Sequence, residues 1–271
     1  MVAEKPEEKN ESFAPETPWP CPERADCDFY HSLDLPDGTS IQGYWDIRGR
    51  FDEYVGGYPL AGKTVLDIGT ATGFLAFSAE AAGARVTALD ARGADEFQRV
   101  PFRDSLYHKD RSAWVREFDA MSHGRLRNGF WYAWHKLQSQ VEVVYASADK
   151  LYSWDRRFDV VLAGAIIEHL ADPVSAIGNM ARLANEAVII AFTHVWDSEE
   201  LLMKANGDWT NPAWDYEWWT LSRGLYDRVF KNLGFAVEIA TCTAVSNPHR
   251  FNDQSTPVEV TRPTIIARRV T

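Results

Sequence analysis

The sequence has few cysteines, no excess of basic residues and no long apolar run, and each shortage excludes a class of protein. Three cysteines in 271 residues are too few for a disulfide scaffold or a dedicated zinc site. The formal net charge of −11 argues against a large nucleic-acid footprint, which needs a basic face. No apolar run approaches the ~20 residues that a membrane-spanning helix requires.

What the chain does have is the composition of a globular protein. With 45% hydrophobic residues, a chain of this length buries one large core. Residues 1–28 are rich in Glu and Pro, so we expect a mobile tail there and a single domain over residues 29–271. The charged start of the chain has no apolar stretch of the signal-peptide kind, which leads us to expect a cytoplasmic protein.

The most informative stretch is Val65-Leu66-Asp67-Ile68-Gly69-Thr70-Ala71-Thr72-Gly73. An apolar run that contains an acid leads into a loop with two glycines, and the Ala-rich residues 74–82 follow. Glycine lets the loop backbone lie close to a ligand, and the start of a helix offers free N–H groups. The pattern therefore predicts a strand, a ligand-binding loop and a helix.

A second acid narrows the choice of ligand. The strand-like run 85–89 ends at Asp90, and an acid at this point of such a unit accepts hydrogen bonds from ribose hydroxyls. A dinucleotide-binding loop would need a glycine where Ala71 stands, and a P-loop would need a Lys-Ser/Thr pair after the glycines. The remaining candidate is a nucleoside that carries a small polar arm and no phosphates.

At this point the chain resembles the class I S-adenosylmethionine-dependent methyltransferases. Their first motif is similar to Asp67-Ile68-Gly69-Thr70-Ala71-Thr72-Gly73, with Thr70-Ala71 in place of the commoner Cys-Gly. The resemblance implies S-adenosylmethionine as cofactor, and it implies that Asp149 meets the adenine amino group. The full set of cofactor contacts expected on this basis is Asp67, Gly69, Thr70, Ala71, Gly73, Asp90, Ala91, Ala148, Asp149 and Gly164.

The rest of the chain alternates strand-like and helix-like segments. Asp172 and Pro173 have the residue types of a helix cap and a first helical residue. Further strands are expected at residues 141–146, 158–164, 186–192, 235–240 and 264–269, with a helix at 221–233. We expect an α/β fold: a doubly wound, Rossmann-like, mostly parallel sheet of seven strands, with helices on both faces and a last antiparallel strand.

Two segments could face a substrate. The cap-like insertion, residues 91–140, carries more bases than acids and several aromatic residues; it forms either a wall for an anionic or aromatic substrate or a surface excursion docked by its aromatics. The aromatic segment, residues 196–219, follows the fifth strand at the sheet edge where such folds place substrate loops. Its candidate substrate residues are Trp196, Trp209, Trp218 and Trp219, which can equally form a packed cover.

A closer resemblance involves residues 30–38 and 43–46, which are similar to the lead-in segment of the tRNA wobble-uridine carboxymethyltransferases. We expect this lead-in segment, residues 29–60, to fold over the cofactor, with Trp45 and Arg48 as contacts. Those enzymes use carboxylated S-adenosylmethionine and hold its added carboxylate with a tyrosine before a histidine. Here Glu168 precedes His169, and it would repel that carboxylate by about 1–4 kcal/mol, so ordinary S-adenosylmethionine and another acceptor are expected.

The Glu-His pair also resembles the metal-binding Glu-x-x-Glu-His run of the ubiquinone-pathway O-methyltransferases. Ala165 replaces the first Glu, and two ligands fall short of a dedicated site, so we expect no metal. His169 is the first candidate for general base, because a histidine with a near-neutral pKa suits proton removal. Glu168 would orient His169 or contact the substrate, and His194 is the second candidate base.

The expected activity is methyl transfer from S-adenosylmethionine to an oxygen (or nitrogen) of a small molecule, as in natural-product or secondary metabolism. A tRNA-modifying methyltransferase and a non-catalytic S-adenosylmethionine-binding module remain as alternatives. No nucleic-acid or membrane partner is expected. The acceptor and the oligomeric state are left open by the sequence.

Overall fold

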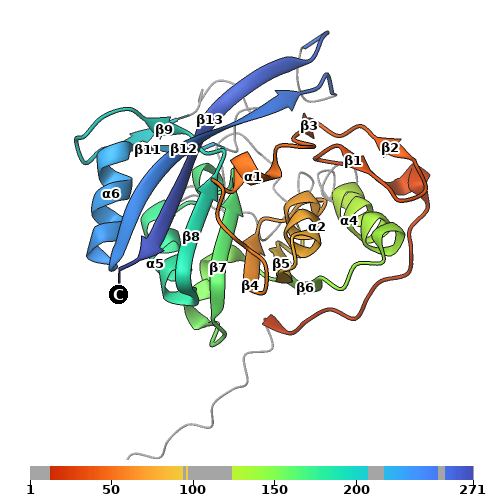
Figure 1. The fold of residues 1–271 in the computed structure, drawn as a ribbon, viewed down its shortest axis with the longest axis horizontal. Helices are drawn as coiled ribbons and strands as arrows, with labels where there is room; N and C mark the ends of the chain where they lie inside the picture. Colours follow the sequence, from red (N-terminus) through yellow and green to blue (C-terminus); the bar gives the residue numbers. More distant parts are fainter. Residues whose placement is uncertain (1–12, 94–95, 97–123, 207–216, 250–253, 271) are drawn as a thin grey trace, which may run out of the picture.

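The computed structural model describes residues 13–93, 96, 124–206, 217–249 and 254–270, and they build an α/β domain around one large sheet (Figure 1). The sheet has eight strands in the order β3-β12-β13-β8-β7-β4-β5-β6. In chain order these are β3 (Trp45–Asp46), β4 (Thr64–Ile68), β5 (Arg85–Asp90), β6 (Glu142–Tyr145), β7 (Phe158–Gly164), β8 (Ala184–Ala191), β12 (Phe235–Ser246) and β13 (Val258–Arg269). The five strands from β8 to β6 run parallel, and β13 pairs antiparallel with β8.

The predicted fold class is confirmed, but the predicted count of seven strands is wrong. The eighth strand, β3, comes from the lead-in segment and pairs antiparallel with the far end of β12. Its two residues are too few to show any periodicity, so no sequence pattern could reveal it. Through this pairing, the lead-in segment is hydrogen-bonded to the main sheet.

Helices cover both faces of the sheet. Successive residues of a strand point to opposite faces, so Val65 of β4 packs with α2 (Phe74–Ala81) and α4 (Gly124–Leu137). Leu66 packs with the other group, α5 (Pro173–Leu183) and α6 (Arg223–Asn232). A four-residue helix, α1 (Phe51–Tyr54), and the 3-10 helices η2 (Arg24–Asp26), η5 (Ala148–Ser153) and η6 (Ile167–His169) complete the helical elements among the described residues.

The helix signals in the sequence are confirmed in detail. Asp172 is the N-cap of α5 and accepts a hydrogen bond of 3.0 Å from the backbone N–H of Ser175, with Pro173 as the first helical residue. Helix α6 starts two residues later than predicted, because Ser222 is its N-cap. Gly234 follows its end with a φ of +81°.

Strands β12 and β13 are longer than the predicted segments 235–240 and 264–269. Each has twelve residues, and they pair without interruption from Phe235↔Arg269 to Ser246↔Val258. Figure 1 shows them as a ribbon that runs on past the neighbouring strand β8. The extension lacks the apolar run of a central strand, although Cys242 and Ala244 are buried in the core, so no sequence pattern marks its length.

Two smaller sheets lie outside the main one. The strands β1 (Leu33–Asp34) and β2 (Ser40–Ile41) form a hairpin in the lead-in segment. The aromatic segment supplies β9 (Val195–Trp196), β10 (Met203–Ala205) and β11 (Trp219–Ser222), in the order β10-β11-β9.

The N-terminal residues that are described lie against the domain. The ring of Phe13 stacks on Trp154 at a centroid distance of 4.5 Å, and the backbone N–H of Glu16 donates to the carbonyl of Val143 at 2.7 Å. The mobile tail expected over residues 1–28 is therefore not seen over residues 13–28. The remainder of that tail, residues 1–12, lies outside the described residues.

Of the cap-like insertion, the structure describes residues 91–93, 96 and 124–140. Here α4 buries Phe130 and Trp131 in the core, which agrees with aromatic side chains that dock a helix. The greater part of the insertion lies outside the described residues. Within the described ranges, no helix combines the length and the apolar character needed to cross a bilayer.

Candidate active site

The glycine loop joins β4 to α2 at the carboxyl edge of the parallel strands. Gly69 and Gly73 adopt φ values of +75° and +85°, and the backbone N–H of Gly69 donates to Leu89 at 2.8 Å. A Cβ at Gly69 would come within 2.9 Å of Ile166, and one at Gly73 within 2.4 Å of the Phe77 ring. The backbone conformation therefore favours glycine at both positions, and at Gly73 the rings also leave no space for a Cβ.

Asp90 lies directly against this loop. One carboxylate oxygen accepts a hydrogen bond from the N–H of Ala71 at 2.7 Å, and the other accepts one from the N–H of Ala91 at 2.8 Å. Ala71 adopts a φ of +50°, so the loop is bent where the acid holds it. The fold thus brings together the second acid and the glycine loop, as the sequence predicts.

Asp67 lies at the end of β4 and is fully buried. Within the described residues, neither of its carboxylate oxygens accepts a hydrogen bond that meets the usual geometric limits. Burial raises the pKa of Asp67 to about 7; the neighbouring Thr70 hydroxyl opposes the rise, and the negative charge of Asp90 adds to it. A buried carboxylate in this state suits a ligand that brings a cationic or N–H donor group.

The lead-in segment covers the glycine loop. The hydroxyl of Thr72 accepts hydrogen bonds from the backbone N–H groups of Tyr30 and His31, at 3.2 and 3.4 Å. A Cβ at Gly43 would lie 2.2 Å from the carbonyl carbon of His31, so two backbone strands touch there. Burial lowers the pKa of His31 to about 3, which keeps its imidazole neutral.

The two predicted cofactor contacts in this segment lie in different surroundings. Trp45 packs edge-on against Phe192, at the end of β8, with 5.3 Å between ring centroids. The guanidinium of Arg48 bonds instead to Asp34 at 2.6 Å and Asp46 at 2.5 Å, within and beside the β1–β2 hairpin. Within the described residues, the guanidinium of Arg48 therefore bonds to acids of the lead-in segment rather than to the glycine loop.

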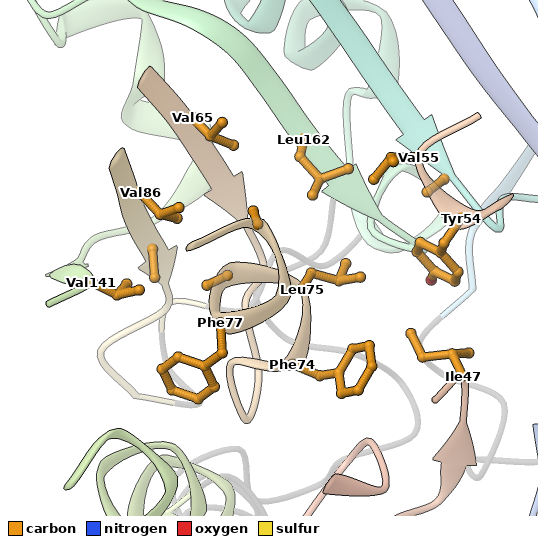
Figure 2. Packing of buried hydrophobic residues seen from close by; sticks show 14 of the residues in the cluster. Ile47, Tyr54, Val55, Val65, Phe74, Leu75, Phe77, Val86, Val141 and Leu162 are labelled. Atoms are coloured by element: carbon orange, nitrogen blue, oxygen red, sulfur yellow. The ribbon is translucent and has the colours of Figure 1, made fainter. Parts of the chain in front are cut away.

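The remaining predicted cofactor residues lie at the same edge of the sheet. Ala148 and the exposed Asp149 open η5 just after β6, whose neighbour in the sheet is the Asp90 strand β5. Gly164 ends β7, and a Cβ there would meet Leu75 at 2.6 Å and the Tyr54 ring at 3.4 Å. Figure 2 shows Tyr54 and Ile47 of the lead-in segment near Phe74 and Leu75 of α2.

Glu168 and His169 lie in η6, the turn that follows β7. The side chain of Glu168 is buried, and its Oε2 accepts a hydrogen bond of 3.2 Å from the Thr193 hydroxyl. His169 is half-buried in the same turn. After burial itself, the charge of Glu168 raises the pKa of Tyr30, which reaches about 12, and it also raises the pKa of Tyr226.

The aromatic segment docks on this turn. The N–H of Trp218 donates to the carbonyl of Glu168 at 2.7 Å, and the indole N–H of Trp219 donates to Ala171 at 3.1 Å. Trp218 is buried, whereas Trp196 is 43% exposed on β9. The structure thus brings Trp218 and Trp219 to η6, turns much of Trp196 to the surface and leaves Trp209 outside the described residues.

The second candidate base, His194, follows β8. Its Nε2 lies 3.7 Å from a carboxylate oxygen of Glu217, and both side chains are about one-third exposed, at 34% and 35%. A carboxylate near an imidazole can orient the ring and stabilise its protonated form. Among the described residues, no group of three or more His, Cys, Asp or Glu is arranged to hold a metal ion.

Sequence reasoning missed several residues that line this region. They are Tyr30 and Tyr54 of the lead-in segment, Thr193 after β8, Tyr226 of α6 and Arg262 of β13. Thr193 had a weak signal, because it directly follows a predicted strand. Tyr30 and Tyr54 belong to the lead-in segment, which the sequence predicts here as a whole but without these two residues as contacts. Tyr226 and Arg262 have no signal, since Tyr226 reads as a helix core residue and Arg262 lies beyond the apolar part of its strand.

Comparison with known proteins agrees with this geometry. A methyltransferase domain family matches residues 47–239. No curated protein matches the chain. Among solved structures, the N-terminal domain of EvdMO1 with bound SAH has a TM-score of 0.54 at 17% identity, covering 89% of this chain and 92% of that chain. The same domain in the presence of SAH and D-fucose has a TM-score of 0.54 at 15% identity, covering 89% of this chain and 91% of that chain.

A third structure, magnesium protoporphyrin IX methyltransferase from Synechocystis PCC 6803 with bound SAH, has a TM-score of 0.46 at 15% identity, covering 81% of this chain and 80% of that chain. At these identities the structural likeness shows the fold alone. The family match is the stronger result, because it spans well over half of the chain and includes the glycine loop, both acids and η6. The chain belongs to the methyltransferase domain family, and it is a methyltransferase.

Proposed function

We propose that the protein transfers a methyl group from S-adenosylmethionine to an oxygen (or nitrogen) of a small-molecule acceptor. The observation that carries this proposal is the cover over the carboxyl end of β7. The lead-in segment reaches this region with Tyr54, and the aromatic segment bonds to η6 through Trp218 and Trp219. An acceptor site that is enclosed on two sides suits a small molecule better than a polymer. The net charge of −11 supports the same choice.

The residues at the glycine loop fit the cofactor. Asp90 has the position of a ribose-binding acid, and its carboxylate is already held by the loop. The buried Asp67 has oxygens available for a donor such as the amino group of the cofactor. When bound, S-adenosylmethionine supplies a methyl group on a sulfonium, which is already activated for displacement. The protein then has to align the acceptor atom and remove its proton.

We assign proton removal to His169, with Glu168 as the group that contacts the acceptor. His169 is half-buried in η6, so part of the residue remains exposed at this edge of the sheet. Glu168 is held by Thr193 and lies among tyrosines that come from the lead-in segment and α6. His194 is the second candidate base, supported by the nearby carboxylate of Glu217.

We further propose that the methyl donor is ordinary S-adenosylmethionine, even if the chain is related to the tRNA wobble-uridine carboxymethyltransferases. Glu168 occupies the position where those enzymes carry a tyrosine for an added carboxylate. Because the Glu168 side chain is 1% exposed, water screens its charge poorly, and a second carboxylate nearby would be repelled.

The test combines calorimetry and a turnover assay on the full chain. S-adenosylhomocysteine should bind with measurable heat, and S-adenosylhomocysteine should form when S-adenosylmethionine is supplied with mixtures of small hydroxylated or aminated compounds. Cofactor binding without turnover of any mixture, together with a salt-sensitive shift of tRNA in a gel, would replace the small-molecule proposal by the tRNA alternative. Binding without turnover of either class would favour a non-catalytic binding module.

A further inference from the structure

Arg262 is a cation at the carboxyl edge of the sheet that the proposed chemistry does not yet use. It lies on β13 just before the point where that strand meets the end of β8. There the N–H of Thr193 donates to the carbonyl of Pro263 at 3.0 Å, and the N–H of Phe192 donates to the Thr264 hydroxyl at 3.4 Å. Arg262 is therefore next to the segment that holds Glu168.

Among the residues that the structure describes, aromatic rings rather than acids lie against the guanidinium. Its central carbon lies 4.8 Å from the ring centroid of Phe192 and 5.7 Å from that of Trp45. Within the described residues, no carboxylate forms an ion pair with it. Arg268 of the same strand differs, since it lies 3.9 Å from a carboxylate oxygen of Glu238. Rings offset part of the charge of a guanidinium but leave its N–H groups in need of acceptors.

The rings beside Arg262 connect it to the glycine loop. The N–H of Trp45 donates to the carbonyl of Tyr30 at 2.8 Å, and the N–H of Tyr30 donates to Thr72 of the loop. Arg262 and Glu168 both act on the pKa of Tyr30, in opposite directions. The cation and the buried acid thus both lie close enough to act on one tyrosine, whose backbone bonds to the glycine loop.

Phe192, the ring closest to the guanidinium, has a backbone φ of +53°. A bulky residue rarely adopts this left-handed conformation, and strain of this kind collects at ligand sites. Here it directs the end of β8 so that Phe192 stacks on Tyr54 at 5.8 Å while it also supports Arg262. The local backbone is therefore arranged around the arginine and its rings.

We propose that Arg262 anchors an oxyanion of the methyl acceptor, so that the acceptor carries a carboxylate or phosphate group as well as the atom that is methylated. A guanidinium presents a planar fork of N–H donors that matches either oxyanion in two parallel hydrogen bonds. With Glu168 beside the methylated group and Arg262 on the anion, the site orients an acceptor that has two different ends. This inference rests on the proposed small-molecule function.

The test measures binding of three simple probes to the full chain saturated with S-adenosylhomocysteine: benzoate, phenyl phosphate and the neutral benzamide. The arginine side-chain NMR signal that is absent in Arg262→Gln identifies the site, and its shift on titration gives each dissociation constant. We expect benzoate or phenyl phosphate to bind at least about tenfold more tightly than benzamide, as charge-assisted hydrogen bonds predict. The tighter of the two anions identifies the group.

The variants decide whether Arg262 is responsible. Arg262→Gln should abolish the preference for the anion, and Arg262→Lys, which keeps the charge but not the fork, should retain part of it. Arg268→Gln is the matched control, because Arg268 lies on the same strand as Arg262 and also stacks on a ring. Its guanidinium carbon is 4.6 Å from the ring centroid of Tyr58. This control variant should leave the preference unchanged. Should Arg262→Gln not fold, Arg262→Lys provides the comparison.

Equal binding of benzoate, phenyl phosphate and benzamide by the wild type, including no binding of any, would overturn the inference. So would an anion preference that survives in Arg262→Gln or in a folded Arg262→Lys at full strength. Calorimetry with S-adenosylhomocysteine separates this failure from that of the proposed function. Loss of cofactor binding in the wild type would remove both, whereas intact cofactor binding with no anion preference removes only the role of Arg262.

Discussion

The proposed cofactor half and the proposed acceptor half of this candidate site are built in different ways. The cofactor half consists of the glycine loop and two acids within residues 67–90, and its main contacts join neighbouring strands of the sheet. The acceptor half gathers η6, the residues after β8, the lead-in segment, the aromatic segment and β13 from distant parts of the chain. The difference shows how the common cofactor chemistry can stay local while the acceptor chemistry depends on long-range packing.

This comparison predicts that single changes in the acceptor half affect turnover and leave cofactor binding intact. His169→Ala should lower turnover by about 10²- to 10⁴-fold, because a positioned general base contributes that much. The affinity for S-adenosylhomocysteine should remain within about twofold of the wild type. Formation of S-adenosylhomocysteine, with His194→Ala measured in parallel, checks this, and near-normal turnover of His169→Ala would transfer the role to His194.

In the cofactor half, the buried Asp67 should make stability depend on pH. Its pKa is about 7 in the folded protein and about 3.8 in the unfolded chain, so the folded state binds more protons between these values. The associated stability is fully present below about pH 3.8 and is lost as pH rises through 7. Asp67→Asn has no such loss, so relative to the wild type it should gain about 2–4 kcal/mol in free energy of unfolding between pH 4 and pH 8.

Denaturant melts of both proteins at each pH measure this gain. Comparing the two proteins at every pH cancels the opposite contribution of His31, whose folded pKa of about 3 lies below its ordinary value. The contribution of His31 to the free energy of unfolding is lost as pH falls below about 6.5, and this loss is the same in both proteins. A constant difference between Asp67→Asn and the wild type across the range would show that Asp67 is not desolvated as described.

The glycine loop should tolerate substitution poorly. Gly73→Ala should cost about 3 kcal/mol, because alanine adds left-handed backbone strain and a Cβ only 2.4 Å from the Phe77 ring. The matched control is Gly62→Ala, since Gly62 has a φ of +76° and open space around its Cβ position. It should cost only about 1 kcal/mol. Equal losses in thermal or chemical melts would mean that strain alone, and not the packing of α2 and α4, fixes the loop.

The smallest expected effect is on cofactor affinity. Asp90→Ala should weaken binding of S-adenosylhomocysteine by about 10- to 100-fold, the value of one or two hydrogen bonds to a charged group. Turnover at saturating cofactor should change little, in contrast with His169→Ala. Calorimetry with Glu238→Ala, an exposed acid on β12, as control measures the change. An unchanged affinity would place the ribose elsewhere.

The sequence predicted the local half of the molecule well. The strands β4, β5 and β7, the α5 cap and the glycine loop follow from runs of adjacent residues, whose signals do not depend on the rest of the chain. It could not predict β3 or the full length of β12 and β13, because these pair through backbone hydrogen bonds that leave little side-chain pattern. The packing of residues 13–28 was missed for a related reason: a Pro- and Glu-rich composition does not reveal single anchors such as Phe13.

By itself, the sequence determined the strand, the glycine loop, the helix and the second acid beside the loop, since the spacing of adjacent residues encodes that local geometry; that this unit binds a nucleoside cofactor stays a prediction. Only the tertiary structure decided which residues meet Glu168 and which rings hold Arg262. Tyr30, Thr193, Tyr226 and Arg262 are far apart in the chain, and only the order of strands in the sheet and the burial of the core bring them to one edge.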